Sequence, residues 1–162
     1  MKRTVSIALA LTLILVVVGV TVWAGPGRQG TVPTPPEEVD LIPDEPVALG
    51  TVEITCSCSG TAIRVEDPEE EFGPAPDDLE FLADGVTVVL GKECEVKVCY
   101  PYPEDTEEKD GQIYKWDYDA EEWKLPETEE GELIEPTISG DPKQICIVDE
   151  KVTDGTYALI GG

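Results

Sequence analysis

The sequence predicts an all-β protein: an antiparallel β-sandwich of the Ig-like or Greek-key type, preceded by an N-terminal signal or anchor helix and a proline-rich spacer. Three observations predict it. Short runs of alternating apolar residues follow one another from residue 51 onward, turn residues separate these runs, and no helical periodicity occurs past residue 24. We therefore expect a signal or anchor at 1–24, a linker at 25–50 and the sandwich at 51–162.

The N-terminus has the features of a secretory signal. Lys2 and Arg3 precede an uncharged apolar run that ends near Ala24, a small residue suited to cleavage. The run is also long enough to remain as an uncleaved membrane anchor. Both alternatives predict an exported chain, either secreted or held at the cell surface through this N-terminal helix.

Residues 25–50 predict a semi-extended linker. The segment holds six of the 14 prolines of the chain, together with glycine and acidic residues, and it lacks apolar periodicity. Such a composition is typical of a spacer between an anchor and a folded domain.

Roughly nine short strands are expected after the linker. The first alternates apolar and polar residues, and an acidic loop with three prolines follows the second. The expected strands are Val52–Cys56, Ile63–Val65, Leu79–Leu82, Val86–Leu90, Glu95–Tyr100, the hairpin described next, Leu133–Ile138, Ile145–Val148 and Thr156–Ile160.

Residues 111–126 predict a β-hairpin with an aromatic face. Tyr114, Trp116 and Tyr118 alternate with charged residues, the acidic residues 119–122 reverse the chain, and Trp123 follows. An isolated two-stranded hairpin is barely stable in water. We therefore expect another part of the chain to cover the rings.

The last third resembles a known group of modules. A strand ending in Tyr100-Pro101, the Trp116-to-Trp123 hairpin and a final Thr156-Tyr157-Ala158-Leu159 strand occur in this order. Residues 95–160 thus resemble the C-terminal half of the β-sandwich modules shared by ankyrins, netrin receptors and zonula occludens proteins. A similar order closes the autoproteolysis-inducing domain of adhesion receptors, but the chain has no histidine and carries Thr153-Asp154-Gly155-Thr156 at the corresponding place, so self-cleavage is not carried over. The resemblance implies an extracellular interaction or structural module.

The charge limits the partners. The chain holds 35 acidic and 11 basic residues, a net charge of −24. Such a charge repels nucleic acid and disfavours an anionic membrane surface, whereas it permits cations or a basic partner. We expect an unidentified protein or surface polymer as the partner.

Five cysteines predict two disulfides and one remaining thiol, as is typical of an exported chain. Cys56 and Cys58 stand two apart on one strand, a poor geometry for bonding each other. We expect Cys94 or Cys99 to pair with Cys146, and a thiol of the Cys56/Cys58 pair to meet the other one. The alternative is a Zn²⁺ or Cu(I) site with Cys56, Cys58, Cys94 and Cys99 as thiolate ligands, although its spacing lacks the C-x₂-C pattern. No cofactor is expected.

Asp117, Asp119 and Glu121 are weak candidates for a cation site. Their alternation resembles the start of a calcium loop, but Glu121 and Glu122 stand where a third ligand and a glycine are needed. A hairpin turn with solvated carboxylates is the expected structure, and no metal site is predicted with these residues.

Tyr100, Tyr102, Trp116 and Trp123 could face a carbohydrate ligand, with packing in the sheet core as the competing interpretation. Tyr100 and Tyr102 are expected to be the most exposed, because two prolines follow them and keep the segment out of a central strand.

The sequence favours a protein that is not an enzyme. Without histidine, Ser-His-Asp and Cys-His arrangements are impossible. Carboxylate pairs of the glycosidase type are compatible with the residue types, but nothing singles out two of them. The expected function is an exported, non-catalytic interaction or structural module. The alternatives are a cation- or glycan-binding module and, last, a carboxylate-based hydrolase.

Overall fold

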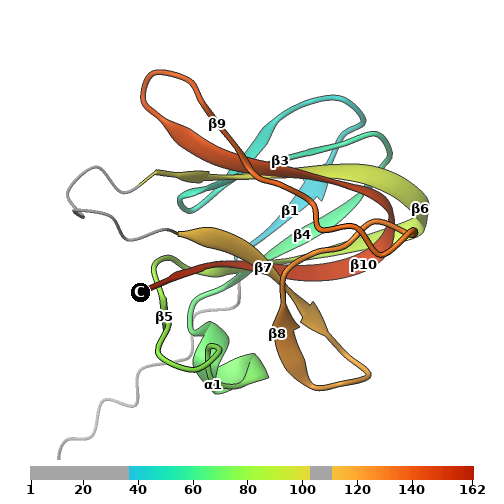
Figure 1. Ribbon diagram of the computed structural model, residues 1–162. Coiled ribbons are helices and arrows are strands. Elements are labelled where there is room, and N and C mark those ends of the chain that lie inside the picture. The colour runs from blue at the N-terminus through green and yellow to red at the C-terminus, as the bar shows by residue number, and fades with distance from the viewer. Residues whose placement is uncertain (1–36, 103–110) are drawn as a thin grey trace, which may run out of the picture. The chain divides into compact units, whose positions relative to one another are not determined.

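The computed structural model of the chain describes residues 37–102 and 111–162, which belong to one compact unit (Figure 1). Antiparallel strands dominate it, which confirms the all-β prediction. The elements are β1 Glu38–Leu41, β2 Val47–Leu49, β3 Val52–Cys56, β4 Gly60–Val65, α1 Pro68–Phe72, β5 Glu80–Phe81, β6 Gly85–Pro101, β7 Gln112–Asp117, β8 Glu122–Lys124, β9 Thr137–Ser139 and β10 Gln144–Gly161.

The expected signal or anchor helix at residues 1–24 lies outside the described residues. Within residues 37–102 and 111–162, no helix is long and apolar enough to cross a membrane.

Two long strands form the centre of the sheet. Along the main path the order is β1-β4-β6-β10-β7-β8, and all pairs are antiparallel. β3 pairs with β6 and carries β2 on its other edge, whereas β5 and β9 pair with β10. The runs expected as separate strands at Val86–Leu90 and Glu95–Tyr100 are one strand, and so are the two runs of β10. The sequence analysis was wrong to divide them.

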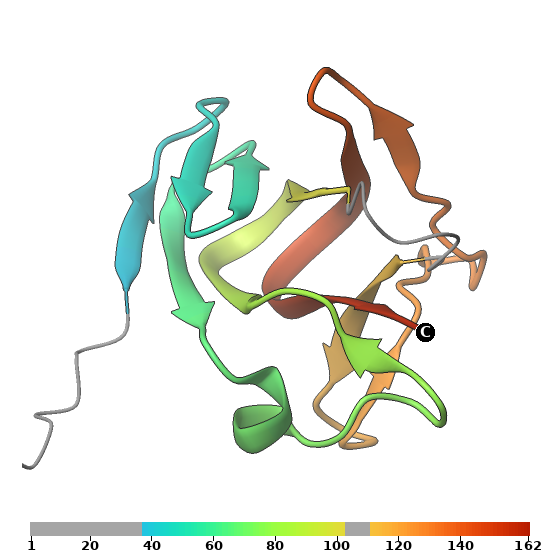
Figure 2. The ribbon, with the colours of Figure 1, turned by 90° about the vertical axis from the view of Figure 1, so that its left-hand side faces the viewer.

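β6 and β10 bend together. The first part of β6 pairs with β4 and its last part pairs with β3, so the two arms of this strand have different neighbouring strands. The register of β10 against β6 shifts twice between Asp149 and Asp154, and Lys151 adopts a φ of 60° within this stretch. Figure 1 shows both strands turning at the same side of the molecule, and Figure 2 shows the curvature from a second direction. β-Bulges of this kind increase the local bend of a strand.

The main core lies on the inner side of the bend. Alternate residues of each arm of β6 belong to it, from Val86 to Leu90 and from Cys94 to Tyr100. β10 contributes Ile145 and other residues to the same core. The alternation expected of half-buried strands therefore holds along both arms of β6 and is interrupted in the bend, where Lys92 is exposed.

A second, smaller core lies on the aromatic face of the hairpin formed by β7 and β8. Trp116 and Trp123 face each other across the two strands, with ring centroids 5.3 Å apart. Phe72 of α1 contacts both rings edge-on, at 5.7 and 6.0 Å, and Phe81 of β5 contacts Trp123. The prediction that other parts of the chain cover the aromatic face is confirmed, although Tyr118 remains 54% exposed.

The helix α1 was not expected. The sequence analysis assigned this region to an acidic loop, but Asp67 accepts a hydrogen bond from the backbone N–H of Glu70 and so caps a short helix. Pro68 occupies the first turn, where its missing N–H costs nothing, and the acidic side chains that follow suit the positive end of the helix dipole.

Part of the expected linker belongs to the folded unit. β1 pairs with β4 over four residues and β2 pairs with β3 over three. Leu41 and Leu49 are buried in the main core. The folded domain therefore begins by Glu38 and not at residue 51, because these two apolar side chains provide the burial that the proline-rich composition obscures.

The expected strand Leu133–Ile138 is mostly irregular. Leu133 forms an isolated bridge with Glu127, and only β9 pairs with β10 in this region. Leu133 and Ile138 are 56% and 53% exposed, so the segment does not contribute these side chains to a core.

Candidate functional site

The five cysteines form two disulfides and one free thiol. Cys99 is bonded to Cys146, its direct partner in the register of β6 and β10, and Cys58 is bonded to Cys94. Cys56 is free and buried. These pairings agree with the sequence-based expectation that Cys146 meets a cysteine of the Cys94–Cys99 strand and that Cys58 or Cys56 meets the other.

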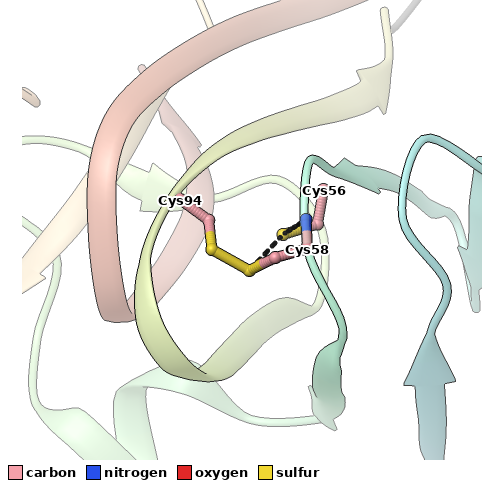
Figure 3. Close-up of side chains that lie close together, drawn as sticks. All are labelled: Cys56, Cys58 and Cys94. Atoms are coloured by element: carbon pink, nitrogen blue, oxygen red, sulfur yellow. Dashed lines mark hydrogen bonds between the residues drawn. A yellow bond between two sulfur atoms is a disulfide. The ribbon is translucent and has the colours of Figure 1, made fainter.

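The free thiol lies against one of the disulfides. Cys56 ends β3, Cys58 follows in the short connection to β4, and Cys94 lies in the bend of β6 (Figure 3). Cys56 Sγ is 3.8 Å from Cys58 Sγ and accepts a hydrogen bond from the backbone N–H of Cys58 at 3.4 Å. The three sulfur atoms lie within 4.8 Å of one another and are all buried. We call this group the cysteine triad (Cys56, Cys58 and Cys94), which combines a free thiol and a disulfide.

The four-sulfur metal site considered above does not form. Cys99 is bonded to Cys146, and Cys58 and Cys94 are bonded to each other. Metal ligation needs thiolates, whereas disulfide sulfurs are poor ligands. The arrangement leaves one thiol, Cys56, in contact with a disulfide.

The candidate ligand-facing aromatics are not exposed as a group. Tyr100 has no exposed surface and donates a hydrogen bond to the backbone carbonyl of Tyr157, while Trp116 and Trp123 are 8% and 5% exposed. Tyr102 is half-buried against the main core. The expectation that Tyr100 would be exposed was wrong, because it lies in β6 and points inward; the competing interpretation, packing in the core, describes these rings.

The cation candidates belong to a hairpin turn. Asp117 Oδ1 accepts hydrogen bonds from the backbone N–H groups of Asp119 and Ala120, and its Oδ2 pairs with Lys124 Nζ at 2.7 Å. These bonds to the charged carboxylate, with that of Lys124 the largest, lower the pKa of Asp117 to about 2. Both oxygens of Asp117 are therefore engaged, and Glu121 occupies a left-handed backbone position with φ of 52°. The carboxylates organise the turn and do not converge as ligands.

A wide acidic hollow lies between the start of α1 and β5. It measures about 680 Å³ and is lined by seven carboxylates: Glu66, Asp67, Glu69, Asp77, Asp78, Glu80 and Asp84. Asp67 caps α1 and Asp84 pairs with Arg64. Together the seven carboxylates make the surface of this hollow strongly negative.

A buried polar cluster joins the two arms of the bent β10. Asp149 accepts hydrogen bonds from Tyr157 Oη at 2.8 Å and from Lys115 Nζ at 2.7 Å, and Lys115 also lies over the Tyr157 ring. Burial, followed by the negative charge of Asp149, raises the pKa of Tyr157 well above its usual value. Because each polar atom has a partner, the cluster stabilises the bend.

Sequence analysis did not find this cluster. Alternation alone places Asp149 and Tyr157 on the same face of β10, but in a straight strand these residues would lie about 26 Å apart. The bend at the two register shifts brings them into contact. No local pattern around Lys115 distinguishes it from a solvated hairpin lysine.

Comparison with known proteins gave no relative: no family model, no curated protein and no solved structure matches the chain.

Proposed function

We propose that the chain is an exported, non-catalytic, acidic β-sandwich that serves as a cell-surface or extracellular interaction or structural module. The observation that carries this proposal is the pair of disulfides, Cys58–Cys94 and Cys99–Cys146, which join cysteines 36 and 47 residues apart in the sequence. Structural disulfides of this kind persist mainly in oxidising compartments. The signal-like N-terminal sequence supports the same compartment.

The sandwich architecture is the finer part of the proposal. The shared bend of β6 and β10, with the main core on its inner side, supports a two-layer arrangement of Ig-like or Greek-key type. The resemblance of residues 95–160 to the modules of ankyrins, netrin receptors and zonula occludens proteins supports the same type. The proposal predicts that an experimental structure has two facing layers built from the two arms of these strands.

The hydrogen bonds of the buried polar side chains support a non-catalytic role. Within residues 37–102 and 111–162, the buried polar residues are Asp149 and Thr156. Asp149 holds the bend, and Thr156 bonds to the hydroxyls of Thr87 and Tyr118. These groups are used for packing, which favours a structural or binding role over turnover.

The partner is proposed to be an unidentified protein or a surface polymer. A net charge of −24 favours a basic surface and disfavours nucleic acid. Contact with a membrane would occur through the N-terminal segment alone, if that segment stays uncleaved.

The compartment can be tested by fractionating the cells that produce the full chain. We expect the protein in the medium or on the surface, accessible to a membrane-impermeant amine label, with both disulfides intact by mass spectrometry. Recovery in the cytoplasm with five free thiols would contradict the proposal.

Cation binding is the second candidate, favoured by the acidic hollow between α1 and β5. A calcium titration followed by thermal melting tests it, with Asp77→Asn/Asp78→Asn as the variant and Glu129→Gln/Glu130→Gln, on a separate exposed loop, as the matched control. A specific site would raise the melting temperature of the parent and the control but not of the hollow variant. Equal shifts in all three would indicate loose screening.

The remaining alternatives have less support. Glycan stacking would need exposed rings, whereas three of the four candidate rings are buried. A carboxylate-based hydrolase should show turnover on a panel of polysaccharides, and inactivity there would remove it.

A further inference from the structure

The cysteine triad brings a thiol into contact with a disulfide. Cys56 Sγ lies 3.8 Å from Cys58 Sγ, and Cys58 is bonded to Cys94 (Figure 3). Thiol–disulfide exchange requires a thiolate to reach one sulfur of a disulfide, and its rate depends on which sulfur is accessible. In this chain the nucleophile and its target are already adjacent.

The surroundings favour attack on Cys58. The backbone N–H of Cys58 points at Cys56 Sγ, which places a donor on the sulfur that carries negative charge during attack. The expectation that Cys56 and Cys58 share one strand, and are therefore poorly placed to bond, was wrong, because Cys58 lies in the three-residue connection between β3 and β4. The pairing of β3 ends at Cys56 and that of β4 begins at Gly60, so a shift of Cys58 leaves these strand pairs in place. Closing the 3.8 Å gap between the two sulfurs to the bond length of about 2 Å would form the new disulfide.

We propose that the cysteine triad is a thiol–disulfide exchange site that moves the free thiol of the chain from Cys56 to Cys94. Cys56 loses its proton to solvent, and its sulfur attacks Cys58 Sγ with an electron pair. The Cys56–Cys58 bond forms while the Cys58–Cys94 bond breaks, and the electrons of the broken bond leave on Cys94 Sγ. The number of disulfides is unchanged, so the step needs no oxidant or reductant.

The exchange changes where the thiol can react. Cys56 is 1% exposed and faces the main core. Cys94 is 5% exposed and borders an open hollow of about 300 Å³, whose other lining residues include Glu93, Glu95 and Lys151. The exchange therefore moves the thiol from the core to the edge of a hollow, where a small disulfide reagent has a shorter path to it than to Cys56.

The test uses the full exported chain and a chromogenic aromatic disulfide, dithiobis-nitrobenzoate, without denaturant. The thiolate of Cys94 attacks the reagent, forms a mixed disulfide and releases one thionitrobenzoate. We expect one equivalent to be released. Pepsin digestion at acid pH, where exchange is arrested, followed by mass spectrometry should then place the adduct on Cys94 and a disulfide between Cys56 and Cys58. An adduct on Cys56 with Cys58–Cys94 intact, or release only after unfolding, would overturn the proposal.

Two variants test the origin of the reactive thiol, and the second separates exchange from simple exposure. Cys56→Ser removes the one free thiol and keeps both native disulfides, so we expect no release; one equivalent from this variant would show that the reagent opens a native disulfide directly and would contradict the mechanism. Cys94→Ser removes the leaving thiol, so Cys56 and Cys58 should bond to each other and leave no reactive thiol. Two free thiols in this variant would show that the Cys56–Cys58 bond cannot form. Circular dichroism checks that both variants retain the strand content of the parent.

Discussion

Gly155 lies where the returning arm of β10 packs most tightly against its own side chains. A Cβ atom at this position would be 2.8 Å from Tyr157 Oη and 2.9 Å from its Cε2. The ring cannot move aside freely, since its hydroxyl is bonded to Asp149. We predict that Gly155→Ala lowers the free energy of unfolding by about 1–3 kcal/mol, the usual cost of overpacking.

The control for this substitution is another glycine. A Cβ at Gly91, in the bend of β6, meets no atom within 4 Å, so Gly91→Ala should change stability by less than about 0.5 kcal/mol. Urea unfolding of both variants gives the comparison. Equal losses would show that the Gly155–Tyr157 contact does not restrict the bend.

The contribution of Tyr157 to the stability of the fold decreases at alkaline pH. Burial raises the pKa of Tyr157 and of Tyr100 in the folded chain above the usual value of 10.0, which the unfolded chain retains. Their contribution is therefore fully present below pH 10 and is lost as the pH rises above it. We predict that Tyr157→Phe costs about 1–2 kcal/mol at neutral pH through the lost hydrogen bond to Asp149, but that its stability then falls less steeply above pH 10.

Urea unfolding from pH 7 to 11.5 measures both effects. Tyr102→Phe, at a half-buried ring near the end of β6, controls for the loss of a phenol at neutral pH. A parallel decline of the parent and Tyr157→Phe above pH 10 would contradict the prediction.

At the scale of residues, the sequence identified the cysteines but not their chemistry. Compartment and strand spacing were enough to expect two disulfides and one remaining thiol. That Cys56 is the free one, and that it contacts Cys58, depends on the turn between β3 and β4. The hydrogen bond between Asp149 and Tyr157 could not be predicted from the sequence either. It depends on the bulges that shift the register of β10, and an alternating pattern does not show where a bulge occurs.

At the scale of elements, α1 packs against the aromatic core of the hairpin and covers it from solvent. Phe72 contacts three rings, those of Trp116, Trp123 and Tyr118. We predict that Phe72→Ala lowers the free energy of unfolding by about 2–3 kcal/mol, less than for a fully buried phenylalanine, and shifts tryptophan emission to longer wavelength as water reaches the indoles. Leu133→Ala, at an apolar side chain that is 56% exposed, is the control. Similar losses from both substitutions would argue against a covering role for α1.

The disulfide between β6 and β10 should contribute to stability through the unfolded chain. Cys99 and Cys146 close a segment of 47 residues. Chain-entropy arguments give about 2–4 kcal/mol for a loop of this size. We predict that Cys99→Ala/Cys146→Ala loses that amount in urea unfolding while the cysteine triad keeps its disulfide. An unchanged unfolding midpoint would mean that native-state strain offsets the entropy.

The elements divide into those with a strong local pattern and those without one. The hairpin followed from alternation and was predicted, and so were the two apolar runs that form the arms of β6, although their continuity and the burial of Tyr100 were not. The helix α1 was missed although Asp67-Pro68 followed by three glutamates is a recognisable helix start. β1 and β2 were missed because short edge strands among prolines bury only single leucines, Leu41 and Leu49, which no periodicity test detects.

At the scale of the whole molecule, charge opposes folding. A net charge of −24 makes the compact state repel itself. Raising the ionic strength from 10 to 150 mM shortens the screening length from about 30 to 8 Å. We predict that this change raises the free energy of unfolding by about 1 kcal/mol, which corresponds to a few degrees in melting temperature for a domain of this size. Scanning calorimetry in NaCl measures it, and a lower melting temperature at the higher salt concentration would contradict it.

The position of β10 in the sheet has a consequence for synthesis. β10 pairs with β5, β6, β7 and β9, yet it comes after all of them in the chain. A ribosome releases the N-terminal side first, so these four strands emerge before the strand they share. Cys58 and Cys94 can meet during this interval, whereas Cys99 must wait for Cys146. Neither the sheet nor the second disulfide can therefore be completed before β10 has emerged, and until then the edges of β6 and β7 that pair with β10 have no partner strand.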